Sequence, residues 1–274
     1  MDCKSYSDWL IVSDIDGTLN NKLRRTPKVN TKAIDDFVHK RGGNFTLASA
    51  RNVQSLRPHY KNLPDVSTPA VVLNGAGIYD FGCEKMLWFN PMPEIGADII
   101  RGTMKKFPHL EVGVFTKDMI YLVRPKIASP VMMALGSLTH KKVKSIDEVP
   151  VGDWGKVIFF CLPWQKRKIK EYLFSVSSEE VAYIDTSIGS FDMVNSTTNK
   201  GNAVLRLADI LGVSENNIGA IGDYYNDLDM LRTVRHSACC KQAPDELHKI
   251  CEYVACHCND GAVADFIQYI YNTY

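Results

Sequence analysis

The sequence has no excess of charge of either sign, no long apolar run and no signal-like start. It holds 32 basic and 31 acidic residues, for a formal net charge of +1. A surface for nucleic acid is therefore not expected, and an anionic ligand has to be held by a few placed groups. No run approaches the roughly 20 apolar residues of a membrane span, and the N-terminus has no apolar signal core. We predict a cytoplasmic protein that binds neither nucleic acid nor membrane.

The eight cysteines also lack any framework spacing. This argues against a disulfide scaffold and is typical of a reducing compartment, where most cysteines are buried as small apolar side chains. One group near the C-terminus could form a zinc site, although the usual Cys-x-x-Cys spacing is missing: Cys251, Cys256, His257 and Cys258. The sequence leaves open whether these four residues have any metal role.

The order of the expected elements indicates an α/β core. With 274 residues, of which 45% are apolar, the chain is long enough for a core and an inserted module. Strands and helices first alternate, as in a parallel sheet with right-handed crossovers. Strands are expected at residues 9–12, 44–48 and 70–73, with helices at 30–41 and 53–60. The rhythm returns with a helix at 200–211, a strand at 218–221, a helix at 227–234, a strand at 237–240, and helices at 245–250 and 262–271.

The central part of the chain follows a different pattern. Hairpins are expected at 78–89, 112–123 and 181–194, the last turning at Ile188-Gly189. Between them lie expected helices at 94–107, 130–138 and 166–175 and a strand at 156–161. Antiparallel hairpins inserted between parallel units favour a second, α+β domain. We predict a discontinuous core of residues 1–81 and 195–274 and an α+β domain of residues 82–194.

The most informative stretch is Trp-Leu-Ile-Val-Ser-Asp-Ile-Asp-Gly-Thr-Leu, residues 9–19. Its apolar strand ends at Asp14 and Asp16, and ligands bind outside the carboxyl ends of parallel strands. Two carboxylates this close repel each other, which a hard cation such as Mg²⁺ relieves. A carboxylate can also act as a nucleophile toward phosphorus. An acidic turn without chemistry remains the alternative for a bare Asp-x-Asp.

The longer string Asp-x-Asp-Gly-Thr-Leu resembles the first motif of the haloacid dehalogenase (HAD) superfamily. Three further matches follow in the right order: Ser49 after a strand, Lys200 in Thr-Asn-Lys-Gly, and the run 222–227, Gly-Asp-Tyr-Tyr-Asn-Asp. The position of the insert, the turn Asn74-Gly75-Ala76 and the terminal Asn259-Asp260-Gly261 are similar to the Cof-like branch, subclass IIB. The resemblance implies a doubly wound, Rossmann-like core with an inserted α+β cap domain of the C2B type.

The resemblance also implies roles for individual residues. Asp14 would be the nucleophile, and Asp16 would protonate the leaving oxygen and later activate water. The Mg²⁺ ligands would be Asp14, the backbone carbonyl of Asp16, and Asp223. Phosphoryl oxygens would be held by backbone N–H groups near Ile15 and by Ser49, Lys200 and Asn226. Asp227 would hold Lys200 or a metal-bound water, and Arg51 would contact substrate or form an ion pair within the protein.

Several of these residues have a plainer interpretation. Ser49 could cap the helix after it, and the family pattern Ser/Thr-Gly-Arg is changed here to Ser49-Ala50-Arg51. Lys200 begins a helix, where a cation is unfavourable, so an anionic partner has to compensate. Asn226 or Asp227 could be a helix N-cap. The sequence does not decide which residues of the insert face a cleft, among them His109, Phe115, Tyr121, Arg124, Trp154, Trp164 and Asp192.

The expected function is that of a Mg²⁺-dependent phosphatase with an aspartyl-phosphate intermediate, acting on a small phosphorylated metabolite, by family default a sugar phosphate. The acid at position 16 favours a phosphatase or mutase over a transport ATPase or a dehalogenase. A phosphohexomutase resembling phosphomannomutase is the first alternative; it needs a basic set in the insert, for which 141–144 and 166–168 are candidates. A non-enzymatic metabolite sensor is the second. We expect a monomer or a small homo-oligomer.

Overall fold

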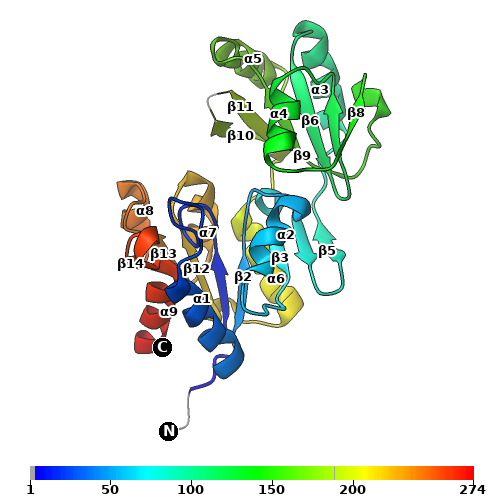
Figure 1. Ribbon diagram of the computed structural model, residues 1–274. Helices are drawn as coiled ribbons and strands as arrows, with labels where there is room; N and C mark the ends of the chain where they lie inside the picture. Colours follow the sequence, from blue (N-terminus) through cyan, green and yellow to red (C-terminus); the bar gives the residue numbers. More distant parts are fainter. Residues whose placement is uncertain (1–3, 188) are drawn as a thin grey trace. The chain divides into compact units, whose positions relative to one another are not determined.

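The computed structural model describes residues 4–187 and 189–274, so Cys3 and the predicted turn residue Ile188 lie outside the described residues. The chain divides into two compact units (Figure 1). Unit 1 consists of the residues up to Leu87 together with Asn199–Tyr274, and unit 2 consists of Trp88–Thr198. None of the described helices has the length and apolar character that a membrane crossing requires.

Unit 1 is built on a parallel sheet with the strand order β14-β13-β12-β1-β2. Its strands are β1 (Leu10–Ser13), β2 (Asn44–Leu47), β12 (Ile218–Gly222), β13 (His236–Cys240) and β14 (Tyr253–Ala255). In the central pair, Ser13 of β1 lies opposite Ile221 of β12. The two strands therefore end at the same edge of the sheet, where Asp14 and Asp223 follow them.

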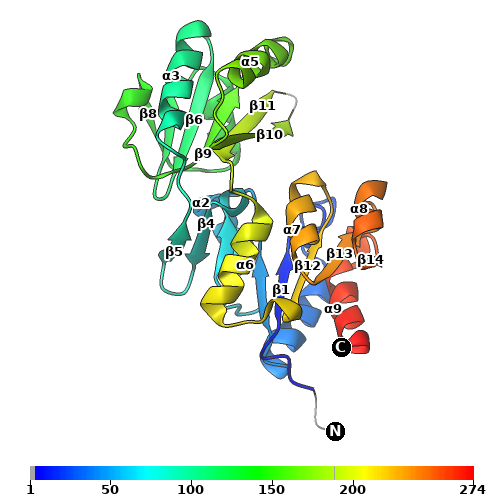
Figure 2. The same ribbon diagram turned by 180° about the vertical axis from the view of Figure 1, so that it is seen from behind.

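Helices cover both faces of this sheet. They are α1 (Lys28–Asp35), which continues as a π-helical turn over Asp36–Lys40, α2 (Val53–Lys61), α6 (Lys200–Leu211), α7 (Leu228–Thr233), α8 (Asp245–Ile250) and α9 (Ala262–Thr273). Helices α1 and α9 pack together on one face, and α6 and α7 pack together on the other, as Figures 1 and 2 show. The predicted doubly wound α/β core is confirmed.

The third expected parallel strand belongs to a separate sheet. Strands β3 (Ala70–Val72), β4 (Gly77–Asp80) and β5 (Lys85–Phe89) form a three-stranded sheet, and β3 joins β2 only through a single bridge between Ala48 and Val71. The chain turns back directly after β3, because Leu73 and Asn74 both have a positive φ, of 56° and 59°. No crossover helix intervenes, so β4 pairs with β3 in antiparallel fashion.

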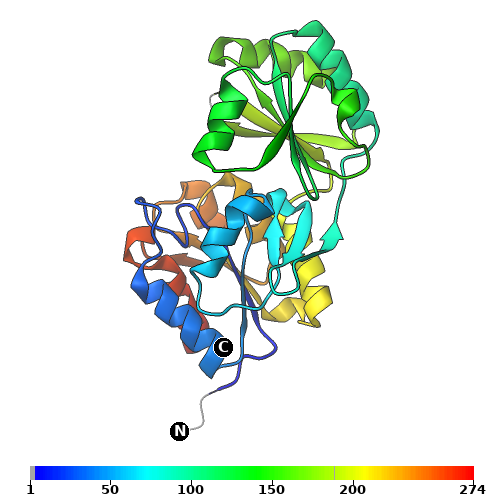
Figure 3. The ribbon, with the colours of Figure 1, turned by 45° about the vertical axis from the view of Figure 1, so that its right-hand side comes forward.

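Unit 2 is an α+β structure in which helices pack beside a sheet (Figure 3). The sheet has six strands in the order β10-β11-β9-β6-β7-β8. Its strands are β6 (Glu111–Thr116), β7 (Ile120–Val123), β8 (His140–Val143), β9 (Trp154–Phe160), β10 (Val181–Ser187) and β11 (Ser190–Asn195). Only the pair β7–β8 is parallel among the described pairs of this sheet.

The apolar core of unit 2 lies between this sheet and two of its helices. Helices α3 (Ile95–Lys106) and α5 (Pro163–Ser175) contribute Ile100 and Leu173 to a cluster that includes Val112, Phe159 and Phe191 of the sheet. The short helix α4 (Ala128–Leu135) is fixed to β6 through Glu111, whose buried carboxylate accepts hydrogen bonds from backbone N–H groups at the start of the helix. Strands β8 and β14 were not predicted.

Candidate active site

The loop after β1 brings its acidic residues to the carboxyl edge of the sheet. Asp14 donates its backbone N–H to the Ile221 carbonyl (3.0 Å), which ties the end of β1 to β12. The chain then turns at Gly17, where φ is +89° and a Cβ would overlap the Asp223 carboxylate. A glycine is therefore needed for both the backbone angle and the close approach of the two loops.

Lys200 joins the two halves of unit 1 at this edge. Its Nζ donates to Asp14 Oδ1 (2.5 Å) and to Asp227 Oδ1 (2.6 Å), and its side chain is completely buried. The helix it begins is capped by Asn199, whose Oδ1 accepts from the Asn202 N–H (2.8 Å). Two carboxylates thus compensate for a cation at the positive end of a helix dipole.

Asp227 holds both Lys200 and the turn that follows β12 in place. Its second oxygen, Oδ2, accepts from the backbone N–H groups of Asp223 (3.0 Å) and Tyr224 (3.3 Å). Gly222 makes room for it, because a Cβ there would lie 2.6 Å from the Asp227 carboxylate. Both oxygens of Asp227 are therefore occupied, and its part is to hold Lys200 and the turn.

Asp14, Asp223 and Asp227 form a compact acidic cluster. One oxygen of each lies within 4.8 Å of the others, and no second cluster of this kind occurs in residues 4–187 and 189–274. The four candidate zinc residues, Cys251, Cys256, His257 and Cys258, accordingly do not converge on one point within the described chain. Asp223 is oriented by Thr18, whose Oγ1 donates to Asp223 Oδ1 (3.0 Å).

The carboxylates of the cluster are hard to ionise together. Burial, and then the charge of Asp227, raise the pKa of Asp14 to about 8, although Lys200 opposes the rise. The same two causes raise the pKa of Asp223 to about 6. Burial by itself would lower the pKa of Lys200. The negative charges of Asp14 and Asp227 have the larger, opposite effect, so the lysine pKa is raised. Because a hard dication favours carboxylate ligands and would offset this repulsion, the residues present fit Mg²⁺.

A cavity of about 380 Å³ opens onto these groups. It is lined by Asp14, Asp16, Ser49, Ala50, Arg51, Asp223, Tyr224 and Asn226. The structure thus brings six of the predicted site residues to one cavity in unit 1. Lys200 and Ile15 are buried beside Asp14 and do not line it. Tyr224 and Tyr225 are exposed, so they do not pack in the core.

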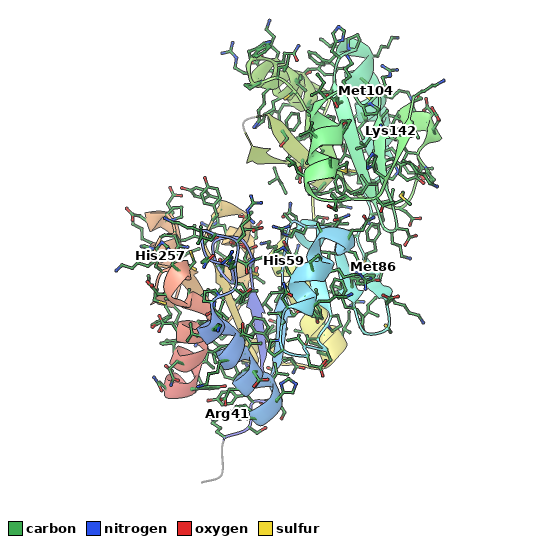
Figure 4. The ribbon with its side chains drawn as sticks, in the orientation of Figure 1. Arg41, His59, Met86, Met104, Lys142 and His257 are labelled. Atoms are coloured by element: carbon green, nitrogen blue, oxygen red, sulfur yellow. The ribbon has the colours of Figure 1, made fainter. Side chains whose placement is uncertain are left out.

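Asp16 and Arg51 form an ion pair at the edge of the cavity. Asp16 Oδ2 accepts from Arg51 Nη2 (2.6 Å) and Nε (3.2 Å), and the Asp16 side chain is half exposed. His59 on α2 (Figure 4) lies close to this pair; burial and then the charge of Arg51 lower its pKa. In this structure, Arg51 therefore takes the second of its two expected roles, as a partner within the protein.

Ser49 does not cap the following helix, contrary to one interpretation of the sequence. Asn52 is the N-cap of α2, since its Oδ1 accepts from the Ser55 N–H (3.1 Å). Ser49 Oγ accepts from the Arg51 N–H (3.3 Å), because the chain makes one more turn before the helix begins. The buried hydroxyl thus remains next to the cavity.

Two polar residues near the cluster were missed from the sequence. Thr18 lies inside the first motif but was given no role, and Gln242 lies outside all four motifs. Gln242 follows β13, and its Nε2 donates to the Gly17 carbonyl (2.6 Å). The rule that ligands gather at the carboxyl ends of parallel strands could have pointed to it.

The undecided residues of the insert fall into two groups in unit 2. Phe115, Trp154 and Asp192 are buried, and Tyr121 is partly buried. His109, Arg124 and Trp164 are exposed. Trp154 belongs to the apolar core, whereas Asp192 forms a buried ion pair with Lys156 (2.9 Å).

Comparisons with known proteins agree on one family. A family model described as haloacid dehalogenase-like hydrolase matches residues 11–267. The chain is 28% identical to the 5-amino-6-(5-phospho-D-ribitylamino)uracil phosphatase YwtE of Bacillus subtilis, over 94% of this chain and 96% of that protein. It is 36% identical to a phosphatase-named protein of Streptococcus pyogenes serotype M6, over 94% and 97% of the two chains.

Solved structures show the same fold at lower identity. A haloacid dehalogenase-like hydrolase from Bacteroides thetaiotaomicron aligns with a TM-score of 0.84 at 18% identity, covering 96% of this chain and 99% of the other. A subclass IIB sugar phosphatase of the HAD superfamily aligns with a TM-score of 0.76 at 15% identity, covering 96% and 98%. These likenesses extend over both units of the chain.

Proposed function

The chain belongs to the haloacid dehalogenase-like hydrolases and is a phosphatase, and from that premise we propose that it hydrolyses a small phosphorylated metabolite with Mg²⁺ through an aspartyl-phosphate intermediate. The observation that carries the proposal is the contact of buried Lys200 with Asp14, beside Asp223, at a cavity lined by Asp16 and Ser49. This arrangement combines a carboxylate nucleophile with fixed positive charge, as phosphoryl transfer requires.

In the first step, Asp14 attacks the phosphorus atom and the bond from phosphorus to the ester oxygen breaks. Asp16 donates a proton to the departing alkoxide; its Oδ1 is available for this because Arg51 engages only Oδ2. Lys200, the Ser49 hydroxyl and Asn226 stabilise the charge on the phosphoryl oxygens. Mg²⁺, held by Asp14, Asp223 and the Asp16 carbonyl, would supply further positive charge to those oxygens when bound.

In the second step, water hydrolyses the aspartyl phosphate. Asp16, now ionised, accepts a proton from the water as its oxygen attacks phosphorus. The bond between phosphorus and Asp14 breaks, inorganic phosphate leaves, and Asp14 is regenerated as a carboxylate. Lys200 remains on Asp14 throughout, so the nucleophile keeps one orientation.

We propose a phosphate monoester of a polyhydroxylated carbon chain, such as a sugar phosphate, as substrate. Two relatives support this class: the Bacillus subtilis protein is named for a phosphoribityl compound, and a structural neighbour is described as a sugar phosphatase. Unit 2, residues 88–198, overlaps most of the predicted cap domain, residues 82–194. We propose that it acts as this cap and determines which metabolite is accepted.

The test is phosphate release from a panel of sugar phosphates, ribityl-type phosphates and nucleotides, with Mg²⁺ or with EDTA. Asp14→Asn is compared with Asp209→Asn, which removes an exposed carboxylate of α6 in the same unit. We expect release that requires Mg²⁺, survives Asp209→Asn and falls by roughly 10⁶-fold in Asp14→Asn, the scale seen when a covalent nucleophile is removed.

Two results would contradict the proposal. Release that persists in Asp14→Asn would remove the aspartyl-phosphate route. Absence of release from every substrate while Mg²⁺ still binds would count against hydrolysis, and activity that depends on added sugar bisphosphate would identify a phosphohexomutase instead.

A further inference from the structure

Gln242 connects three segments of unit 1 next to the acidic cluster. Its Nε2 donates to the Gly17 carbonyl (2.6 Å), and its Oε1 accepts from the Cys258 N–H (3.1 Å). We propose that Gln242 is a positioning residue, which fixes the Gly17–Thr18 peptide so that the loop carrying Asp16 is preorganised for Mg²⁺. This inference rests on the proposed Mg²⁺-dependent function.

The need for such a residue follows from Gly17. A glycine with a φ of +89° has no side chain to restrict its backbone, and it separates the Asp16 carbonyl, a proposed ligand, from the Gly17 carbonyl. Asp223 packs against one side of Gly17, leaving no space for a Cβ. The hydrogen bond from Gln242 fixes the Gly17 carbonyl. The orientation of the Gly17–Thr18 peptide is therefore determined by Asp223 and Gln242 together.

The peptide fixed by Gln242 leads directly to a metal ligand. Its nitrogen belongs to Thr18, whose Oγ1 donates to Asp223 Oδ1 (3.0 Å). A continuous chain of contacts therefore runs from Cys258 through Gln242 and Thr18 to Asp223. Groups that orient metal ligands through hydrogen bonds commonly change metal affinity by about 10- to 100-fold when they are removed.

The far end of Gln242 is firmly held, which makes it an effective support. Cys258 precedes α9, and the segment around it makes two further ties to the loop after Gly17. Asn259 Oδ1 accepts from the Lys22 N–H (3.1 Å). Asn30, which is fully buried, donates to the Leu19 carbonyl (3.0 Å) and accepts from the Ala264 N–H (2.9 Å). Gln242, Asn259 and Asn30 thus each make one tie to this loop. Only that of Gln242 reaches Gly17, which packs against Asp223.

The chemistry of the amide suits this place. It donates at one end and accepts at the other, so a single neutral side chain satisfies a carbonyl and an N–H group. A methionine of similar length can do neither. An ionised glutamate can accept from Cys258 but cannot donate to Gly17, whereas its protonated form can do both.

The test measures Mg²⁺ binding calorimetrically to EDTA-treated protein without substrate, for wild type, Gln242→Met and Asn259→Ala. Asn259→Ala is the matched control, because it removes a tie of the same loop that does not touch Gly17. We expect Gln242→Met to raise the Kd for Mg²⁺ by about 10- to 100-fold and Asn259→Ala to leave it within about twofold. Raising Mg²⁺ from a subsaturating to a saturating concentration should restore more than half of the kcat that Gln242→Met loses relative to wild type. An unchanged Kd in folded Gln242→Met would overturn the inference, whereas failure of the wild type to bind Mg²⁺ would overturn the proposed function.

Gln242→Glu provides a second test, which stands even if the methionine variant does not fold. We expect the Mg²⁺ affinity of this variant, relative to wild type at the same pH, to fall as pH rises, because the introduced carboxyl group loses the proton that it donates to Gly17. If only the added negative charge mattered, the relative affinity would rise with pH, since anions attract the cation. A rise, or no change, would therefore overturn the positioning role.

Discussion

Replacing Lys200 by methionine tests the electrostatic account of the site. Methionine keeps most of the length of the side chain but removes both ion pairs, with Asp14 (2.5 Å) and Asp227 (2.6 Å). Asp227 has no exposed side-chain surface and Asp14 has 9%, so water has little access to the two carboxylates. Removing one partner of a buried ion pair costs about 3–5 kcal/mol of the free energy of unfolding.

The free energy of unfolding that Lys200→Met loses should depend on pH. The direction of this dependence follows from the pKa of Asp14. Its pKa in the folded protein is already raised, to about 8, above the value of 3.8 for an unperturbed carboxyl group. Loss of Lys200 removes an influence that lowers it, so the pKa of Asp14 rises further in the variant. Above about pH 4 the stability of both proteins falls as pH rises, because folded Asp14 holds a proton that the unfolded chain has released. This fall ends near pH 8 in the wild type, where Asp14 ionises, but continues to higher pH in the variant, by up to about 1.4 kcal/mol per pH unit for one proton. The destabilisation is therefore smaller at pH 6 than at pH 9.

The assay is urea unfolding in EDTA at both pH values, with hydrogen exchange at β1 used to assign the transition to unit 1. Lys40→Met is the control, because Lys40 pairs with Asp36 (2.7 Å) on the surface, and such pairs contribute about 0–1 kcal/mol. If Lys200→Met costs no more than Lys40→Met at pH 9, or if its cost is the same at pH 6 and pH 9, the account of the buried cluster is wrong.

Three further predictions concern the same edge of the sheet. Mg²⁺ binding should release protons between pH 6 and 8 and tighten as pH rises, because the pKa values of Asp14 and Asp223 are raised to about 8 and about 6; calorimetry in buffers of different ionisation enthalpy checks this, and a pH-independent affinity contradicts it. Gly17→Ala should abolish the thermal stabilisation by Mg²⁺, since the new Cβ displaces the Asp223 carboxylate; a normal melting shift with Mg²⁺ would refute this. Gly75→Ala should lower the free energy of unfolding by more than about 1 kcal/mol, because φ is +99° and the Cβ would overlap the Asn199 carbonyl; an unaltered urea midpoint would show that the turn can adapt.

The fold class and the family could be predicted from the sequence, because both depend on short-range patterns. The run that ends at Asp14 marks a buried strand and its acidic end together, and the motifs at Ser49 and at 222–227 also come at the ends of buried strands. The comparisons confirm the HAD family, Cof-type. The structure also places Asp14, Asp223 and Lys200 within one small region, although the roles assigned to them remain predictions.

The elements that were missed lack such patterns. Strand β8 (His140–Val143) has the sequence His-Lys-Lys-Val and lies at the edge of its sheet, where few side chains need to be apolar. Strand β14 (Tyr253–Ala255) has three residues, too few for alternation to be recognised. The partner of β3 depends on the left-handed turn at Leu73 and Asn74, and leucine does not signal a positive φ.

Side-chain partners that are distant in sequence were also beyond prediction. Gln242 and Gly17 are 225 positions apart, and no spacing rule connects them. The pairing of Arg51 with Asp16 is a choice between two partners, substrate and protein, that residue types alone do not decide. Such contacts depend on the path of the whole chain.

The separation of Asp14 and Lys200 by 186 positions has a consequence for biosynthesis. At about 5–20 residues per second, the ribosome releases β1 roughly 10–40 s before Lys200 emerges. During that interval, β1 can pair with β2, but its other edge, which later binds β12, has no partner. Unit 2 is complete in sequence by the time α6 emerges and is free to fold first. We therefore expect the nascent core to depend on chaperones at the exposed edge of β1, and the buried charges to meet only when synthesis is nearly finished.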